Sequence, residues 1–392
     1  MRTIHSAPLF LSLCVLVLTC CSSAEDNTPP DSEACHGAVV SSGFGFSWEK
    51  VNHRISLMKV EPRGWQCMSP VEQQAELATA FIGGDWSTGE AMTDIPTLTY
   101  NYQIASATDN LGFVSGSIDF DLAAPENQLQ QTITIDLAQE HLTGFDDYVV
   151  LLNGLELDTR VDEQPDDYPE DYNPAHGYTS RGIGADLSIL ENTGSKLRIS
   201  ALLRFDHGPS DRLDMNSAMP YIRTKGRLHY LVVGVEQGSV ETASVDYRLQ
   251  YEKPELFDDV YLEPATEAQR QVSLSMSGAF ESLLVGWTSF NFNLDEDGLS
   301  DPETGAPIGY YLRDISIQAS IVEYDASSGN LLLDLNGYAS NASGFMSNYA
   351  FDNHFTGSAV AIGASDVTVQ RKTLEKTFDT GELLLPLTGD QQ

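Results

Sequence analysis

Residues 293–301 carry the clearest pattern of metal ligands in the sequence, Asn-Leu-Asp-Glu-Asp-Gly-Leu-Ser-Asp. Side-chain oxygens recur at every second position, Gly298 permits a tight turn, and the next residue offers its backbone carbonyl. Oxygen ligands spaced in this way wrap a hard cation, and calcium is the cation that suits them. The expected calcium ligands are Asn293, Asp295, Asp297, Leu299 and Asp301.

This segment departs from a helix-flanked calcium loop in two ways. Thr304 occupies the twelfth position, where such a loop closes with a bidentate glutamate, and no helical pattern flanks it. A short calcium loop without helices fits the residues. A solvated acidic turn between two strands is the alternative.

A second acidic segment, residues 158–173, holds seven acidic residues and two tyrosines in 16 positions. Its carboxylates could bind a cation, and its tyrosine rings could stack on a sugar face at low entropic cost. An exposed loop has the same composition, and this is the alternative. The expected ligand-binding residues are Asp166, Asp167, Tyr168 and Tyr172.

Evidence for catalysis is weak, so the sequence favours a protein that is not an enzyme and leaves the question open. His207 and His354 each follow a Phe-Asp pair closely, but such histidines are more often half-buried at strand ends. A polysaccharide hydrolase or lyase would need two carboxylates about 5 to 9.5 Å apart. With 57 acidic residues in the chain, a pair at that distance would not identify one.

The elements that position these loops are expected to be strands. From residue 97 onward, apolar residues alternate with polar ones, and turn-forming residues separate the segments. Before that point, Ser69 and Pro70 begin a helical pattern over 71–82, which Gly83 and Gly84 end. The expected fold is all-β, with two tandem antiparallel β-sandwich modules of jelly-roll-like form. A small irregular N-terminal region, 35–95, contains the one helix.

An internal repeat sets the module boundaries. At an offset of 132 residues, positions 177–191 match positions 309–323 with seven identities in fifteen, and 148–154 fall on 280–286. An offset of 134 then aligns Leu197 with Leu331. The repeat predicts one module over 96–252 and a second over 265–385.

Both copies of the repeat keep an arginine, Arg181 and Arg313, at the start of an alternating strand that follows an acidic loop. A guanidinium at that position could hold a carboxylate of the loop in a bidentate pair. Because the loops differ while the arginine does not, a structural role is favoured over ligand binding.

Charge limits the partners of the chain. Its net charge is −36, which disfavours nucleic acid and anionic membrane surfaces because those partners need a basic footprint. A strongly acidic surface suits calcium-rich surroundings and also keeps an exported protein soluble.

The N-terminus predicts export. Arg2 precedes an apolar run of about ten residues, which is too short to span a bilayer and is typical of a secretory signal. The following Leu18-Thr19-Cys20-Cys21 resembles the lipobox of bacterial lipoproteins, with Cys20 where that motif usually has a smaller residue. The resemblance implies a signal peptide at 1–20, acylation of Cys21 (alternatively Cys20), a tether at 21–34 and an outer-membrane location. A soluble exported protein is the alternative.

Two cysteines remain beyond the signal, Cys35 and Cys67, and an oxidising compartment favours one disulfide between them. Together these features predict a lipid-anchored envelope protein, facing the periplasm or the cell surface. Its expected role is binding or adhesion, with a polysaccharide or a surface protein as partner. A polysaccharide hydrolase or lyase, or a structural component of the envelope, is the alternative.

Overall fold

The computed structural model describes residues 37–47, 53–57, 81–84, 97–106, 108, 110–123, 127–161, 178–209, 222–235, 239–249, 265–294, 310–343 and 353–377. All regular structure in these ranges is β-strand, so the expected all-β class is confirmed. None of these residues belongs to a helix long and apolar enough to cross a membrane. The strands are β1 (Gly37–Ser47), β2 (His53–Leu57), β3 (Phe81–Gly84), β4 (Thr97–Ser106), β5 (Leu111–Ala123), β6 (Gln128–Asp136), β7 (Asp147–Val161), β8 (Tyr178–Asn192), β9 (Lys196–Pro209), β10 (Ile222–Val235), β11 (Ser239–Leu249), β12 (Ala265–Ser275), β13 (Ser282–Leu294), β14 (Tyr310–Asp325), β15 (Asn330–Ser343), β16 (Asn353–Ala364) and β17 (Val369–Thr377).

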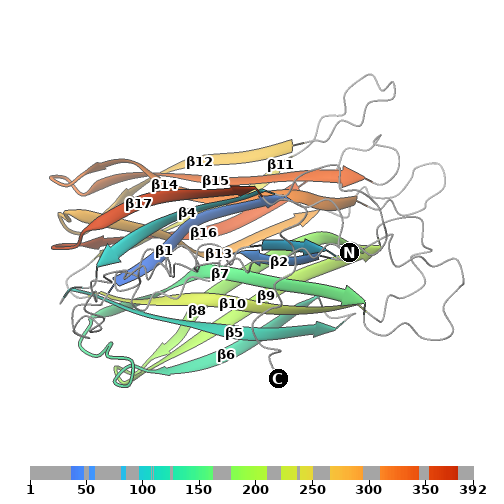
Figure 1. Ribbon diagram of the computed structural model, residues 1–392. Helices are drawn as coiled ribbons and strands as arrows, with labels where there is room; N and C mark the ends of the chain where they lie inside the picture. The colour runs from blue at the N-terminus through green and yellow to red at the C-terminus, as the bar shows by residue number, and fades with distance from the viewer. Residues whose placement is uncertain are drawn as a thin grey trace, which may run out of the picture.

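The strands form three antiparallel sheets that run side by side along the long direction of the molecule (Figure 1). Sheet A has the order β12-β15-β14-β1-β4-β17, and sheet B has the order β11-β16-β13-β8-β9-β6. Sheet C has five strands in the order β3-β2-β7-β10-β5. The three orders are cyclic permutations of one pattern, in which the strands of one repeat pair with those of the next.

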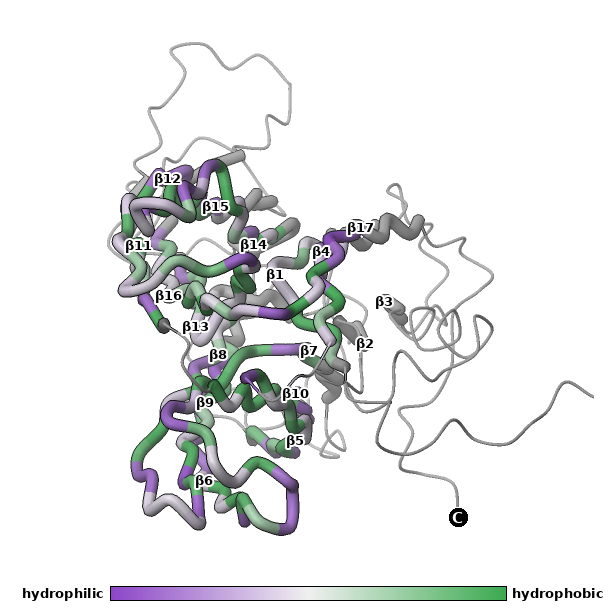
Figure 2. Tube along the Cα trace, turned by 90° about the vertical axis from the view of Figure 1, so that its left-hand side faces the viewer, coloured by the Kyte–Doolittle hydropathy of each residue, from purple (hydrophilic) through white to green (hydrophobic). Residues whose placement is uncertain are grey.

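Viewed along the strands, the sheets enclose three lobes around a common centre (Figure 2). In lobe 2, which is β5 to β10, the strands β7, β10 and β5 lie against β8, β9 and β6. In lobe 3, which is β11 to β16, β13, β16 and β11 lie against β14, β15 and β12. Lobe 1 combines the two ends of the chain: β1, β4 and β17 on one side, β2 and β3 on the other. Each sheet therefore continues from one lobe into the next.

Two apolar cores follow from this arrangement. The larger fills the lobes, between sheets that face each other, and includes Phe205, Phe292 and Phe355. The smaller lies where β1, β7 and β13 meet at the centre, and includes Val40, Leu151 and residues of β10 and β16. The central strands thus bury both faces over their first halves, which explains their nearly continuous apolar runs.

A β-bulge marks the middle of every central strand. It lies at Ser42 in β1, Asn153 in β7 and Thr288 in β13, and pairing with β14, β2 or β8 begins only beyond it. The bulge is therefore the point at which each central strand joins a second neighbour. We call the place where the three strands meet the junction.

Bulges also test the repeat. In β8 they fall at Arg181 and Leu190, and in β14 at Arg313 and Val322, which confirms the offset of 132 residues for this strand. In β7 and β13, however, Asn153 corresponds to Thr288, an offset of 135. The ungapped match of 148–154 with 280–286 is therefore wrong by three residues.

The lobes also change two expected boundaries. Lobe 2 spans 111–235 and lobe 3 spans 239–364, so β11 packs with the strands that follow it and β17 returns to lobe 1. The expected helix over 71–82 is wrong at its last two residues, because Phe81 and Ile82 pair with β2 in sheet C. Aromatic and β-branched side chains suit that strand. Residues 71–80 lie outside the described part.

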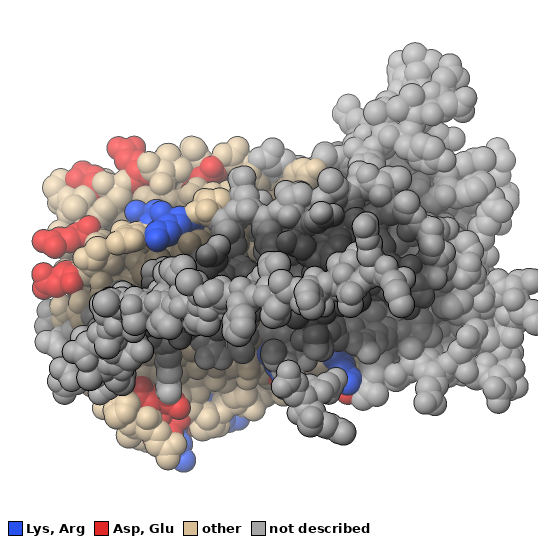
Figure 3. Space-filling model, viewed as in Figure 1, with Lys and Arg blue, Asp and Glu red and all other residues tan. Residues whose placement is uncertain are grey.

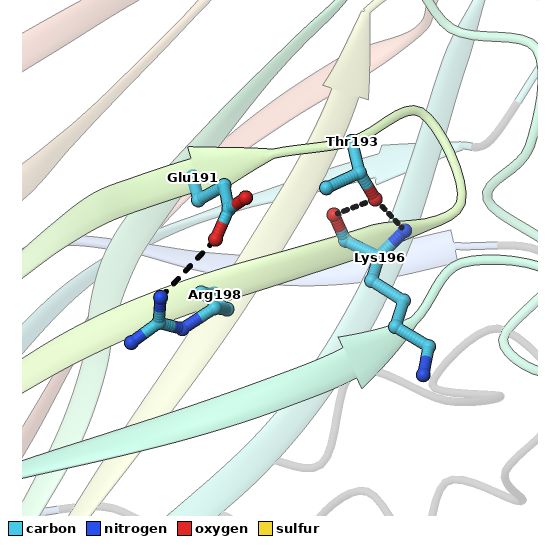
Figure 4. Close-up of polar contacts among 4 residues, drawn as sticks. All are labelled: Glu191, Thr193, Lys196 and Arg198. Carbon is cyan, nitrogen blue, oxygen red and sulfur yellow. Dashed lines mark hydrogen bonds and ion pairs between the residues drawn. The ribbon is translucent and has the colours of Figure 1, made fainter.

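The two hairpins that join β8 to β9 and β14 to β15 show how local sequence sets the turns. Asn192 Oδ1 accepts a hydrogen bond from the Gly194 N–H, and Thr193 Oγ1 bonds both backbone groups of Lys196 (Figure 4). Glu191 and Arg198 pair across the hairpin at 3.1 Å. Gly194 and its counterpart Gly329 both have positive φ, of 78° and 72°.

Alanine at these two glycines is expected to have unequal effects. At Gly194 nothing lies within 4 Å of a new Cβ, so only the backbone strain of about 1 kcal/mol is expected. At Gly329 the Cβ would lie 2.5 Å from the carbonyl oxygen of Met276, and we expect a loss of about 2–4 kcal/mol. Urea denaturation of Gly329→Ala and Gly194→Ala measures both. Equal losses would contradict the packing of this turn against Met276.

Candidate functional site

The described polar side chains that best form a site lie on the face of sheet B that points away from the core of the lobes. Alternation along each strand creates this face, because Phe290 and Phe292 point into the core while Asn291 and Asn293 point the other way. We define the polar face of sheet B by six side chains on five neighbouring strands. They are Asp186, Arg204, Asp246, Asn291, Asn293 and His354.

Register places these side chains in rows. Asp246, Thr356, Asn291, Gly184 and Arg204 are successive partners across β11, β16, β13, β8 and β9. Directly paired residues point to the same face, with neighbouring strands about 4.8 Å apart. His354 and Asn293 lie in the next row on that face, and Asp186 in the row on the other side.

Arg204 connects three strands across this face. Its Nη2 donates to Asn293 Oδ1 at 3.1 Å, and its Nη1 donates to Asn291 Oδ1 at 3.4 Å. The guanidinium crosses β8 at Gly184, where a Cβ would lie 2.7 Å from Asn291 Oδ1. A glycine in the middle of a strand often marks a close approach of this kind. It leaves room above β8 that any larger residue would fill.

His354 and Asp246 form a second polar pair on this face. Nε2 of His354 lies 2.8 Å from Asp246 Oδ1, and the carboxylate side is largely exposed to solvent. Nearby, the hydroxyls of Ser244 and Ser358 are hydrogen-bonded to each other at 3.1 Å. The face therefore presents carboxylate, amide, guanidinium, imidazole and hydroxyl groups from adjacent strands.

Packing beneath the face holds these groups in place. Phe292 and Phe355 stack with ring centroids 4.6 Å apart, and Trp287 meets Phe355 edge-on at 6.2 Å. Each of these aromatic residues lies on β13 or β16, between residues of the polar face. A site on rigid strands needs little reorganisation to bind a ligand.

Asp186 is a carboxylate kept at an energetic cost. Burial in the sheet raises the pKa of its carboxyl above the usual value. Because the folded-state pKa is raised, the charged form destabilises the protein at neutral pH, and the penalty disappears as the pH falls below the unfolded value. A residue that lowers stability in this way is a candidate for a functional role.

Asp186→Asn is therefore expected to stabilise the protein at pH 7. The gain should shrink as the pH falls through the raised pKa and vanish near pH 3, where the carboxyl is protonated in both states. Thermal denaturation of the variant and the wild type from pH 3 to 8 measures it. An asparagine variant that is less stable at pH 7 would show that the carboxylate is stabilised by a partner instead.

The structure reaches only part of the site expected from sequence. Asn293 is described, and the oxygen expected to bind calcium accepts the bond from Arg204, so a cation there would compete with a guanidinium. The other expected calcium ligands, from 295 onward, lie outside the described residues. So do Cys20, Cys21, Cys35 and Cys67, and so do Asp166, Asp167, Tyr168 and Tyr172.

The topology nevertheless places both acidic segments at one end of the molecule. Residues 158–161 belong to β7, so the first acidic segment begins as a strand. β7 ends at Val161 and β13 at Leu294, and these strands hold equivalent places in lobes 2 and 3. The polar face of sheet B reaches the same end at Asn293. In the described part of the chain, no three His, Cys, Asp or Glu side chains are grouped as metal ligands.

Two further expectations concern arginine and histidine. Arg181 and Arg313 lie at equivalent bulges of β8 and β14, as the repeat predicts. His207 and His354 lie on β9 and β16, which occupy different places in their lobes, so they are not counterparts. Arg204, Asp186 and Asp246 were not expected from sequence. Alternation at 290–293, Phe-Asn-Phe-Asn, is the signal that could have found the asparagines.

Comparison with known proteins adds no assignment to this geometry: no protein-family model, no curated protein and no solved structure matches the chain.

Proposed function

We propose that this protein is an exported, lipid-anchored binding protein of the bacterial envelope, and that it holds a polysaccharide on the polar face of sheet B. The observation that carries the proposal is Arg204, which reaches across Gly184 to Asn291 and Asn293. Amide and guanidinium groups fixed side by side donate and accept hydrogen bonds in pairs, and neighbouring sugar hydroxyls can answer both.

The remaining parts of the proposal extend from the sequence. Acylation of Cys21 would anchor the chain in the outer membrane, and calcium would order the segment 293–301 beside the face. Lobes 2 and 3 would be two copies of one jelly-roll-like sandwich. The acidic surface agrees with a partner that is not nucleic acid, since the net charge is −36.

The test is binding to a panel of polysaccharides by protein that begins at Ser22, with calcium or with a chelator. Arg204→Ala is expected to weaken binding by roughly 10- to 100-fold, because hydrogen bonds to a charged group are worth about 1.5–3 kcal/mol. Arg198→Ala is the matched control. It lies on the same strand and face, and its exposed ion pair with Glu191 contributes little.

Each outcome decides between the readings. Retention that depends on Arg204 supports the polar face as the site, and loss of retention with chelator supports the calcium segment. Retention unaffected by Arg204→Ala would contradict the proposed face. Release of oligosaccharides would contradict simple binding and favour a hydrolase or lyase, whereas no retention at all would favour a structural or protein-binding role.

A further inference from the structure

Lobe 1 lacks a strand that the other two lobes have. In lobe 2, β6 pairs with the outer edge of β9, and in lobe 3, β12 pairs with the outer edge of β15. The equivalent strand of lobe 1 is β3, and β2 is its only partner among the described strands. Sheet C therefore has five strands where sheets A and B have six.

The missing strand leaves one sandwich edge different from the others. Where β5 meets β6, Gln131 Nε2 donates to the Asp119 carbonyl at 2.6 Å. Where β11 meets β12, the Tyr247 hydroxyl donates to the Gln269 carbonyl at 2.7 Å. The corresponding edge of lobe 1 is β17, and it has no described strand opposite it in the place of β6 or β12.

β17 carries positive charge where its counterparts are apolar. Counted from the bulge of the neighbouring central strand, Lys372 takes the place of Gly116 in β5 and Ala243 in β11. By the same count, Lys376 takes the place of Phe120 and Tyr247. Ala243 and Phe120 are buried in their lobes, whereas Lys372 is exposed.

Figure 3 shows a compact basic group on this face where Figure 1 places β17, with neutral residues around it. β17 holds three of the 21 basic residues in a chain of net charge −36, namely Arg371, Lys372 and Lys376. An apolar strand would not suit such an edge. A strand that carries carboxylates would.

Chain order and length identify an occupant. In both complete lobes the edge strand precedes the central strand, with six or ten residues between them. The residues that precede β1 are 22–36, and they include Glu25, Asp26, Asp31 and Glu33 but no lysine or arginine. A connection of six to ten residues leaves five to nine for pairing, enough to cover the four residues of β3.

We propose that residues 22–36 complete lobe 1 as its edge strand, paired with β3 and held against Lys372 and Lys376 by the acidic side chains near Glu25. The interaction rests on strand order and charge, and it is independent of the ligand on sheet B. It fixes the segment that leads to the lipid anchor against the body of the protein.

Zero-length carbodiimide cross-linking of the full-length protein in mild detergent tests the inference. The expected product joins Glu25 or Asp26 to Lys372 or Lys376 within one chain, identified by mass spectrometry of peptides. Lys372→Glu with Lys376→Glu should lower the formation of this contact by about tenfold, since every 1.4 kcal/mol is a factor of ten. Adding Glu25→Lys and Asp26→Lys should restore cross-links with the charges exchanged.

A matched control uses two exposed lysines of lobe 2. Lys196→Glu with Lys225→Glu makes the same change in charge and should leave the cross-link unaltered. Cross-links from Lys372 and Lys376 to other carboxylates, or only between isotopically distinct copies, would overturn the assignment of 22–36. So would a cross-link whose yield is the same in the charge-reversed variant.

Discussion

Replacement of Trp287 by alanine is expected to lower the free energy of unfolding by about 3–5 kcal/mol. Trp287 is 1% exposed and lies directly before the bulge of β13, at the junction. Its ring packs against Phe355, and its indole Nε1 donates to the Ser42 carbonyl of β1 at 3.2 Å. The variant therefore leaves a cavity in the core and an unsatisfied carbonyl between two lobes. Urea denaturation followed by far-ultraviolet circular dichroism measures the loss.

Trp287→Phe separates the two effects. Phenylalanine keeps most of the apolar contact but cannot donate to Ser42, so a smaller loss of about 1–3 kcal/mol is expected. If alanine were no more destabilising than phenylalanine, the tryptophan would not fill the core as described.

The junction explains why one side chain should matter so much. Before its bulge, each central strand lacks a neighbour on one side, and side chains supply the missing hydrogen bonds. Asn153 Oδ1 accepts from the Ser41 N–H at 2.9 Å, while Gln103 donates to the Val285 carbonyl at 2.6 Å and accepts from its N–H. These bonds join β7 to β1, and β4 to β13. Buried backbone groups left without partners would be costly.

Periodicity in the sequence predicted the class of fold but not how the strands assemble. The alternation at Leu98, Tyr100 and Tyr102 falls in β4, and the offset of 132 residues is confirmed by the bulges at Arg181 and Arg313. These signals are local, because alternation reflects one buried face of one strand. Which strands become neighbours depends on contacts far apart in the chain, and three sheets shared among three lobes leave no local pattern.

The error of three residues at β7 has the same origin. Leu151 matches Leu283 by letter, yet Leu151 faces the core of the junction while Leu283 faces the core of the lobes. Both faces of these strands are buried over their first halves, so apolar identity carries no information about direction. Only the bulges fix the register there.

The candidate site escaped sequence analysis for a related reason. Arg204 and Asn291 are 87 residues apart and meet only because β8 lies between their strands with a glycine at the crossing. The acidic segments drew attention because their ligands are close together in the chain. A site built across a sheet has one or two residues per strand, and each is unremarkable in its own segment.

Closure of the ring by lobe 1 leads to the second large prediction. β17 pairs with β4 along nine residues, and β1 pairs with β14, so the last strands of the chain hold the first. Ending the chain after Val367 removes β17, exposes the edge of β4 and removes the Arg371 bond to the Leu283 carbonyl. A loss above about 5 kcal/mol is expected, enough to abolish a cooperative unfolding transition in a protein of ordinary stability. A chain ended after Thr377 is the control.

A circular permutant distinguishes loss of the strand from disturbance of the terminus. Opening the turn between β4 and β5, and joining Gln392 to Ser22, places 30 residues between β17 and β1. The equivalent connections from β5 to β7 and from β11 to β13 have 23 and 32 residues, so the new connection has a natural length. The permutant keeps every described strand and is expected to unfold cooperatively, within about 1–2 kcal/mol of the parent. If it failed to fold while the truncated chain folded, the cyclic order of the three sheets would not be what holds the molecule together.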